Sequence, residues 1–170
     1  MRKTKIILMI LIGIFLVGCA KNVEEDLPKE PLEETSKEIG NPPNVNLYSG
    51  DQTVNGTEDK YCWEVEGKIC ALEATPPEER LQGIHPMRVD QGEKITFSLS
   101  ASSLNSLTEI LLPNKVELIQ TKKDEVSTFE VPNREFSAPN EKGIYYYSAI
   151  FTFDGDIKGE AIYAFSLSVR

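Results

Sequence analysis

The residues of this chain that are best suited to chemistry are three cysteines and a single histidine. Cys19 follows an apolar run near the start, and Cys62 and Cys70 are separated by seven residues. His85 is the only imidazole base, and no Gly-x-Ser-x-Gly motif supplies a nucleophile for it. We therefore expect no catalytic residues, and a small hydrolase centred on His85 is the alternative.

Metal ligands are also sparse. His85 and Met87 offer soft ligands, but a type 1 copper centre also needs a second His and a thiolate. Asp154 and Asp156 flank a glycine in a turn that offers oxygens to Ca²⁺, although the loop pattern of an EF-hand is missing. We predict no metal and no cofactor. A metal-handling protein centred on His85 belongs to the same alternative as the hydrolase, and the sequence leaves open whether Asp154 and Asp156 bind a cation.

The stretch before Cys19 has the order of an export signal. Three basic residues within the first five positions precede an apolar run over residues 6–17. That run is shorter than the roughly 20 residues that span a bilayer. Leu16-Val17-Gly18-Cys19 then resembles the lipobox of bacterial lipoproteins. The resemblance implies a signal peptide over residues 1–18, lipidation of Cys19, and attachment to the extracytoplasmic face of the cell membrane. An ordinary signal peptide with a chance Cys is the alternative.

Residues 19–43 have the composition of a tether. Acidic residues outnumber lysines there, apolar residues are few, and four prolines interrupt any long helix. We expect an extended, disordered spacer that lifts a domain over residues 44–170 off the membrane. An amphipathic helix over residues 27–39 is the alternative.

The charge of the chain narrows the class of partner. The net charge is −9, and it falls to −12 when the three basic residues of the signal are removed. An excess of negative charge disfavours nucleic acid and anionic lipid headgroups as electrostatic partners.

Cys62 and Cys70 form an even pair in a chain that we expect to be exported, where disulfides persist. A three-residue loop at 65–67 would place the two cysteines opposite each other on a hairpin. We therefore predict a Cys62–Cys70 disulfide, and a redox or metal-binding pair is the alternative. Trp63, on the opposite face of the strand, either completes the core or is exposed as a recognition residue.

Short alternating runs fill the rest of the domain. Residues 93–100 alternate strictly, and residues 143–153 and 161–169 offer matching apolar faces across a turn. Several short strands with turn signals between them indicate a β-sandwich or a barrel. We expect further strands over residues 45–48, 61–64, 68–72, 107–112, 116–120, 125–131 and 135–138, a surface loop over residues 49–60 and a turn-rich segment over residues 74–80.

Gly143-Ile144-Tyr145-Tyr146-Tyr147 resembles the entry to a late strand of immunoglobulin-like domains, where a Tyr hydroxyl bonds back to the preceding turn. Tyr147 stands where antibody domains carry a Cys. The resemblance implies an all-β, Ig-like or fibronectin-like β-sandwich, and a cupredoxin-like sandwich is its nearest rival.

The Tyr-Cys-Trp…Cys stretch, the following Pro-Pro, a Gly-Glu-Lys-Ile strand and the Tyr-rich final hairpin also resemble a group of small uncharacterised surface lipoproteins of Gram-positive, spore-forming bacteria.

We therefore expect a lipid-anchored, extracytoplasmic binding or interaction module. Its partner would be a protein, a peptide or an envelope polymer. Trp63 and Tyr146 are the candidate binding residues, together with the loops at one end of the sandwich. A small regulator or an immunity-type inhibitor is a further possibility that the sequence does not rank.

Overall fold

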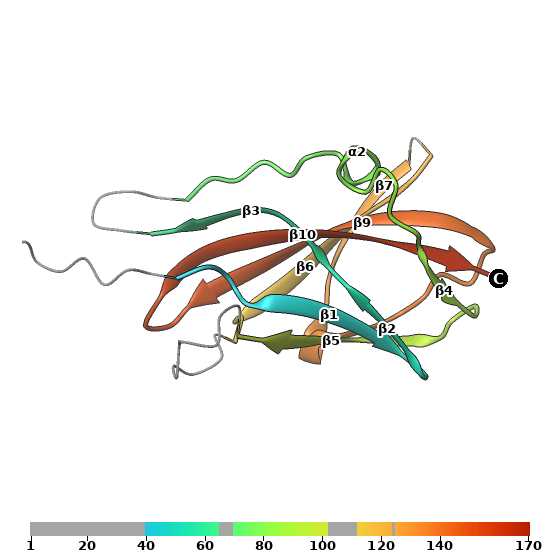
Figure 1. Cartoon of the computed structure of the whole chain (residues 1–170), viewed down its shortest axis with the longest axis horizontal. Coiled ribbons are helices and arrows are strands. Elements are labelled where there is room, and N and C mark those ends of the chain that lie inside the picture. The colour runs from blue at the N-terminus through green and yellow to red at the C-terminus, as the bar shows by residue number, and fades with distance from the viewer. Residues whose placement is uncertain (1–39, 65–69, 102–111, 124) are drawn as a thin grey trace, which may run out of the picture. The chain divides into compact units, whose positions relative to one another are not determined.

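Alternating apolar residues near the end of the chain produce its two longest strands, β9 (Gly143–Asp154) and β10 (Lys158–Val169). They pair antiparallel along their whole length, so the predicted final hairpin is confirmed. The structure is a computed structural model that describes residues 40–64, 70–101, 112–123 and 125–170 (Figure 1).

A six-stranded sheet is built around this hairpin in the order β3-β10-β9-β6-β7, with β4 parallel to the end of β10. All its other neighbouring strands run antiparallel. Among the described strands, β7 is therefore an edge strand that pairs only with β6. The added strands of this sheet are β3 (Thr57–Trp63), β4 (Met87–Val89), β6 (Lys115–Lys122) and β7 (Glu125–Glu130).

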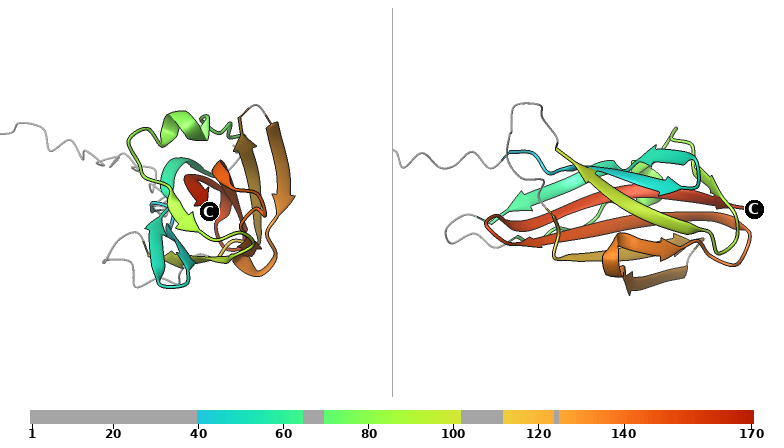
Figure 2. Two further views of the ribbon diagram at one scale, coloured as in Figure 1. Left: turned by 90° about the vertical axis from the view of Figure 1, so that its right-hand side faces the viewer. Right: turned by 90° about the horizontal axis from the view of Figure 1, so that it is seen from below.

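A second sheet, with four antiparallel strands in the order β2-β1-β5-β8, packs on the first (Figure 2). Between the sheets, Phe97 meets the rings of Phe151 and Phe165. Tyr147 is fully buried there and stacks on Phe165 at 4.7 Å between ring centroids. The predicted all-β sandwich is thus confirmed. The strands of this second sheet are β1 (Asn44–Ser49), β2 (Gln52–Asn55), β5 (Lys94–Ser100) and β8 (Glu135–Ser137).

The segment between β3 and β4 covers part of the outer face of the larger sheet. Its short helix α2 (Pro77–Arg80) contacts both β9 and β10, on the side away from the smaller sheet (Figure 2). This cover explains why outward-facing residues of β9 and β10 are buried, namely Ser148, Ile162, Ala164 and Ser166. No helix among the described residues is long and apolar enough to cross a membrane.

Two sequence predictions fail around β3. Residues 49–60, predicted as a loop, contain β2 and most of β3, because backbone pairing with β1 and β10 holds strands that carry no apolar alternation. Residues 70–72, predicted as a strand returning beside β3, have no strand conformation. β3 pairs instead with β10, with Tyr61 opposite Ala161. The loop of that predicted hairpin, 65–69, lies outside the described residues, as do residues 102–111, where most of another predicted strand falls.

The domain begins a few residues before the predicted boundary at 44. Pro42 and Pro43 are buried, and the Tyr163 hydroxyl donates a hydrogen bond to the Pro43 carbonyl. The Trp63 indole Nε1 donates to the Gly40 carbonyl at 2.8 Å. Residues 40–43 therefore belong to the sandwich and not to a tether. The predicted signal, the lipidation site Cys19 and the rest of the predicted tether lie outside the described residues.

Candidate binding surface

The Tyr145 hydroxyl forms the predicted bond back to the turn before β9. It donates to the Glu141 carbonyl at 2.9 Å, and Lys122 Nζ donates to it at 2.8 Å. Lys122 also forms an ion pair with the Glu141 carboxylate at 2.9 Å. The hydrogen bonds to Tyr145 and Glu141 raise the pKa of Lys122 above its usual range, and the bond to Lys122 lowers that of Glu141. This cluster fixes the entry of β9, so Tyr145 points inward and Tyr146 outward.

Tyr146 is half-buried and lies in a cross-strand row on the outer face of the larger sheet, opposite Thr121, which is opposite Val126. The Val126 side chain is 65% exposed, and Ile144, next along the same face of β9, is 51% exposed. The cover over β9 and β10 leaves these side chains accessible. We call this surface the outer patch; it consists of Ile119, Thr121, Val126, Thr128, Ile144 and Tyr146.

β7 has exposed side chains on both of its faces, and only Phe129 is half-buried. The Val131 N–H donates to the Val116 carbonyl at 2.8 Å, which continues the β6–β7 register by one residue pair. Hydrogen-bonded pairs alternate along an antiparallel ladder. The N–H and C=O groups of Val126, Thr128 and Glu130 therefore point away from β6, toward the open edge.

The opposite edge of the larger sheet is covered. Residues 70–80 run beside β3, where Lys60 Nζ donates to the Glu73 carbonyl at 2.8 Å and the Thr75 N–H donates to Asp59 Oδ2 at 2.7 Å. Arg80 also donates to the Glu58 carbonyl. The Cys62–Cys70 disulfide ties the start of this segment to β3, with a Cα–Cα distance of 5.7 Å. The predicted disulfide is therefore present, although the two cysteines do not sit on paired strands.

The edges of the smaller sheet are also less accessible than β7. β8 has only three residues. β2 has four, and its Gln52 Nε2 donates to the carbonyl of Arg88 in β4 at 2.7 Å. Natural sheets commonly protect their edges by covering them or keeping them short. Among the described strands, β7 is the one long edge with neither protection.

Trp63 is a core residue and not an exposed recognition residue. Its side chain is 9% exposed and meets the Phe153 ring edge-on at 5.4 Å. It lies opposite Gly159 on β10, where an added Cβ would come within 2.8 Å of the Trp63 ring and 2.2 Å of the Cys62 carbonyl oxygen. The prediction of Trp63 as a binding residue is therefore wrong, because the small Gly159 lets the indole pack inward.

His85 is exposed in the irregular segment between α2 and β4, and its side chain forms no hydrogen bond with the described residues. A Ser–His–carboxylate arrangement around it is therefore not formed by the described part of the chain. Asp154, the candidate cation ligand, forms an ion pair with Lys158 Nζ at 2.7 Å. In the described ranges, no three His, Cys, Asp or Glu side chains gather closely enough to hold a metal ion.

A groove of about 390 Å³ lies where β6 begins and β7 ends. One wall is the short helix η2 (Pro132–Arg134), in which Asn133 and Arg134 have φ of 54° and 60°. Consecutive left-handed residues other than glycine are uncommon and often occur near binding sites. Because Glu130 also lines the groove, the open edge of β7 leads into it.

Sequence reasoning found Tyr146 but missed the importance of β7. The available signal was Val126-Ser127-Thr128-Phe129, an uncharged stretch rich in strand formers between Glu125 and Glu130. Its position at a sheet edge depends on strand order, which the sequence does not state.

The chain matches no protein-family model, and no curated protein or solved structure matches it significantly. The outer patch, the β7 edge and the groove are therefore the features that bear on its function.

Proposed function

We propose that this chain is a lipid-anchored binding module that is held on the extracytoplasmic face of the cell membrane through Cys19. The lipobox resemblance of Leu16-Val17-Gly18-Cys19 supports the anchor. The Cys62–Cys70 disulfide supports an oxidising compartment, because such bonds persist outside the cytosol. The module meets a protein, a peptide or an envelope polymer and carries out no chemistry on it.

The observation that carries the binding role is the uncovered flank formed by β6 and β7. β7 has an open edge and two exposed faces, and the outer patch continues from it to Tyr146 on β9. Exposed apolar side chains beside unpaired backbone groups form a surface that gains free energy when a partner covers it. The groove at Glu130 extends the same surface.

Site-specific photo-crosslinking on intact cells tests this function. A photoreactive residue replaces Tyr146 or Val126 on the flank, and a matched control replaces Ser98, which is half-buried on the outer face of the smaller sheet. We expect a discrete cross-linked product at Tyr146 and Val126 and none at Ser98. Equal products at all three positions, or none at the two flank positions, would show that this flank is not the binding surface.

A further inference from the structure

We propose that β7 binds an extended, basic polypeptide segment by strand addition, so that the partner becomes a seventh strand of the larger sheet. This inference rests on the proposed function, because it names the chemistry of the partner and the way it docks. The backbone of the β7 edge, its side chains and its charges each support it.

The backbone of β7 offers a complete set of hydrogen-bonding groups to a partner. Val126, Thr128 and Glu130 point their N–H and C=O groups away from β6, as the Val131–Val116 bond requires. An antiparallel strand exchanges two hydrogen bonds with each residue of this kind. An envelope polysaccharide cannot reproduce that regular spacing of donors and acceptors, whereas an extended peptide does.

The side chains at the centre of β7 favour uncharged residues at the centre of the partner strand. Val126 and Thr128 are exposed on the outer face, and both are β-branched. Residues directly opposite each other in an antiparallel pair interact through their side chains. We therefore expect β-branched residues in the partner where it faces Val126 and Thr128.

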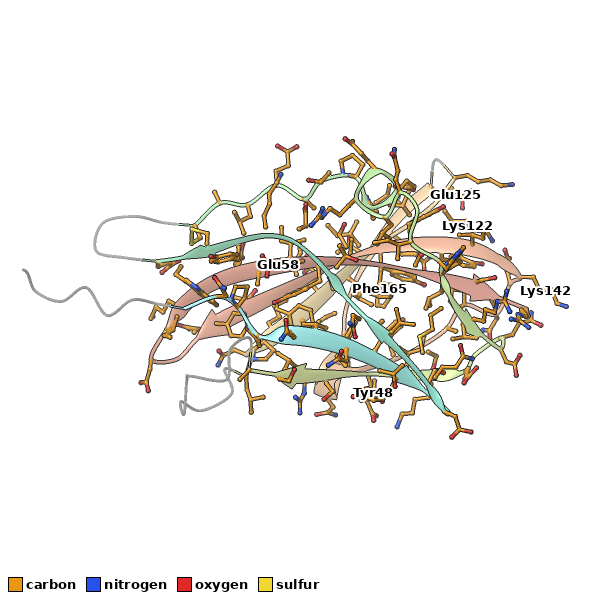
Figure 3. The ribbon with its side chains drawn as sticks, in the orientation of Figure 1. Tyr48, Glu58, Lys122, Glu125, Lys142 and Phe165 are labelled. Carbon is orange, nitrogen blue, oxygen red and sulfur yellow. A yellow bond between two sulfur atoms is a disulfide. The ribbon has the colours of Figure 1, made fainter. Side chains whose placement is uncertain are left out.

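The charges at the two ends of β7 favour a basic partner. Neither Glu125 nor Glu130 forms an ion pair with a described residue, and the electrostatic interaction of Lys115 with Glu130 is weaker than its interaction with Glu117. The nearest basic residues of β6 are already engaged, Lys115 by Glu117 at 2.9 Å and Lys122 by Glu141 at 2.9 Å. Figure 3 shows Lys122 and Glu125 at the turn end of this hairpin. The basic side chains Lys123 and Arg134 lie beyond the ends of β7, in the turn and in η2.

The same charges disfavour a second copy of the chain as the occupant. Each copy carries a net charge of −9, so two copies repel each other at long range. Glutamates at the ends of an edge strand are a common protection against self-pairing. A basic segment is instead attracted by the whole chain and by both ends of β7.

A pair of synthetic peptides tests the inference on the full-length chain in detergent. The first is acetyl-Lys-Thr-Val-Thr-Val-Lys-amide, and the matched peptide has Glu in place of both Lys. We expect the Lys peptide to slow hydrogen exchange at the amides of Val126, Thr128 and Glu130 and to bind about fivefold more tightly than the Glu peptide. Equal affinities, or no protection of these three amides, would overturn the proposal.

Two variants locate the binding. Thr128→Pro removes an outward N–H that β6 does not use, so the sheet keeps its ladder while the Lys peptide loses about tenfold in affinity. Glu130→Lys leaves the backbone and Glu125 unchanged, so each peptide then meets one like charge and one opposite charge at the ends of β7, and the preference for the Lys peptide should be lost. Glu79→Lys on α2 makes the same change of net charge and should leave the preference unaltered. Unchanged binding in Thr128→Pro together with unchanged preference in Glu130→Lys would contradict strand addition.

The outcomes also separate this inference from the proposed function. If the three amides become protected by raising the protein concentration without peptide, the occupant is a second copy and the basic partner is wrong. If photo-crosslinking at Tyr146 succeeds in the Thr128→Pro variant as in the wild type, the flank binds a partner through its outer face and not through its edge. If photo-crosslinking of the wild type gives no product at Tyr146 and Val126, the flank is not the binding surface and the proposed binding role is wrong.

Discussion

At the scale of single residues, the backbone at Gly159 leaves no room for a side chain beside Cys62 and Trp63. Gly159 lies opposite Trp63 in the β3–β10 ladder and has a φ of +149°. The indole fills the space that a side chain at Gly159 would take, and its Nε1 reaches the Gly40 carbonyl. Because Gly159 has no side chain, Trp63 at the end of β3 can pack against β10 and also hold Gly40 at the start of the domain.

Gly159→Ala should lower the free energy of unfolding by about 2–3 kcal/mol, because the new Cβ overlaps the Cys62 carbonyl oxygen and the Trp63 ring. Urea denaturation followed by Trp63 fluorescence measures the change. Gly155→Ala is the matched control, since a Cβ there meets nothing within 4 Å. Similar stability of the two variants would show that the Trp63 contact is looser than described.

Glu93 makes the domain sensitive to acid. The Ser49 hydroxyl and the Asp90 N–H donate to its carboxylate and lower its pKa, with the Ser49 bond as the larger cause. The folded state therefore favours the charged form, and this contribution is lost as the pH falls from the ordinary Glu pKa of about 4.3 through the lower folded value. We expect the urea midpoint of the wild type to fall more steeply below this pH than that of Glu93→Gln. Parallel profiles would rule out this role for Glu93.

At the scale of elements, the disulfide holds a cover in place instead of closing a hairpin. It connects the end of β3 to the segment that runs over the larger sheet toward α2. That segment makes side-chain contacts with β3 but no backbone ladder, so its position depends on the Cys62–Cys70 bond and on polar contacts such as Lys60 with Glu73.

Replacing both Cys62 and Cys70 by Ser should lower the free energy of unfolding by about 2–3 kcal/mol, as the chain-entropy model gives for a loop of this length. Amide hydrogen exchange should increase mainly over residues 71–81, while β9 and β10 keep their protection. Reducing the disulfide of the wild type should give the same pattern. A uniform increase over the whole sandwich would mean that the bond supports the core and not the cover.

The sequence predicts the elements whose stability comes from burying one face. β5 alternates strictly, and β9 and β10 each carry one continuous apolar face, because one set of residues on each strand packs between the sheets. β2 and the first part of β3, residues 57–60, escape prediction because pairing at a sheet edge, and not burial, holds their polar residues. The end of β3 lies in the predicted strand over residues 61–64. The Cys62–Cys70 spacing predicts contact between two residues correctly, but contact does not imply that their segments pair as strands.

The candidate site, too, is predictable from the sequence only where side-chain alternation along one strand decides the structure. The outward direction of Tyr146 is predictable, because it alternates with Tyr145 and Tyr147 along one strand. The exposure of Val126 and Thr128 is not, because it depends on the number of strands in each sheet and on which strand ends the order.

At the scale of the whole molecule, the two sheets are unequal. The larger has six strands and the smaller four. α2 lies against β9 and β10, on the face of the larger sheet that points away from the smaller sheet. β7 is left with both faces exposed and one edge unpaired. The surface that we propose for binding thus results from unequal sheet widths.

Cys19→Ser should release the protein from membranes, because lipidation is the proposed attachment and each buried acyl CH₂ contributes about 0.8 kcal/mol. Fractionation of cells into membrane and soluble material measures the partition, and circular dichroism of the variant should show an unchanged β-domain. Cys62→Ser with Cys70→Ser is the control, since it removes cysteines without touching the anchor. Full retention of Cys19→Ser in membranes would disprove the anchor.

Residues 40–43 also determine how a mechanical load enters the domain. The Gly40 and Pro43 carbonyls are held by Trp63 and Tyr163, immediately before β1 begins. A pull from the N-terminal side therefore strains these two side-chain bonds before it reaches the ladder between β1 and β5. Because the ladder bonds lie perpendicular to the strands, a pull along β1 shears them together. We therefore expect the domain to unfold under tension in two steps. The hydrogen bonds of Trp63 and Tyr163 break first, and the β1–β5 ladder then breaks as a unit.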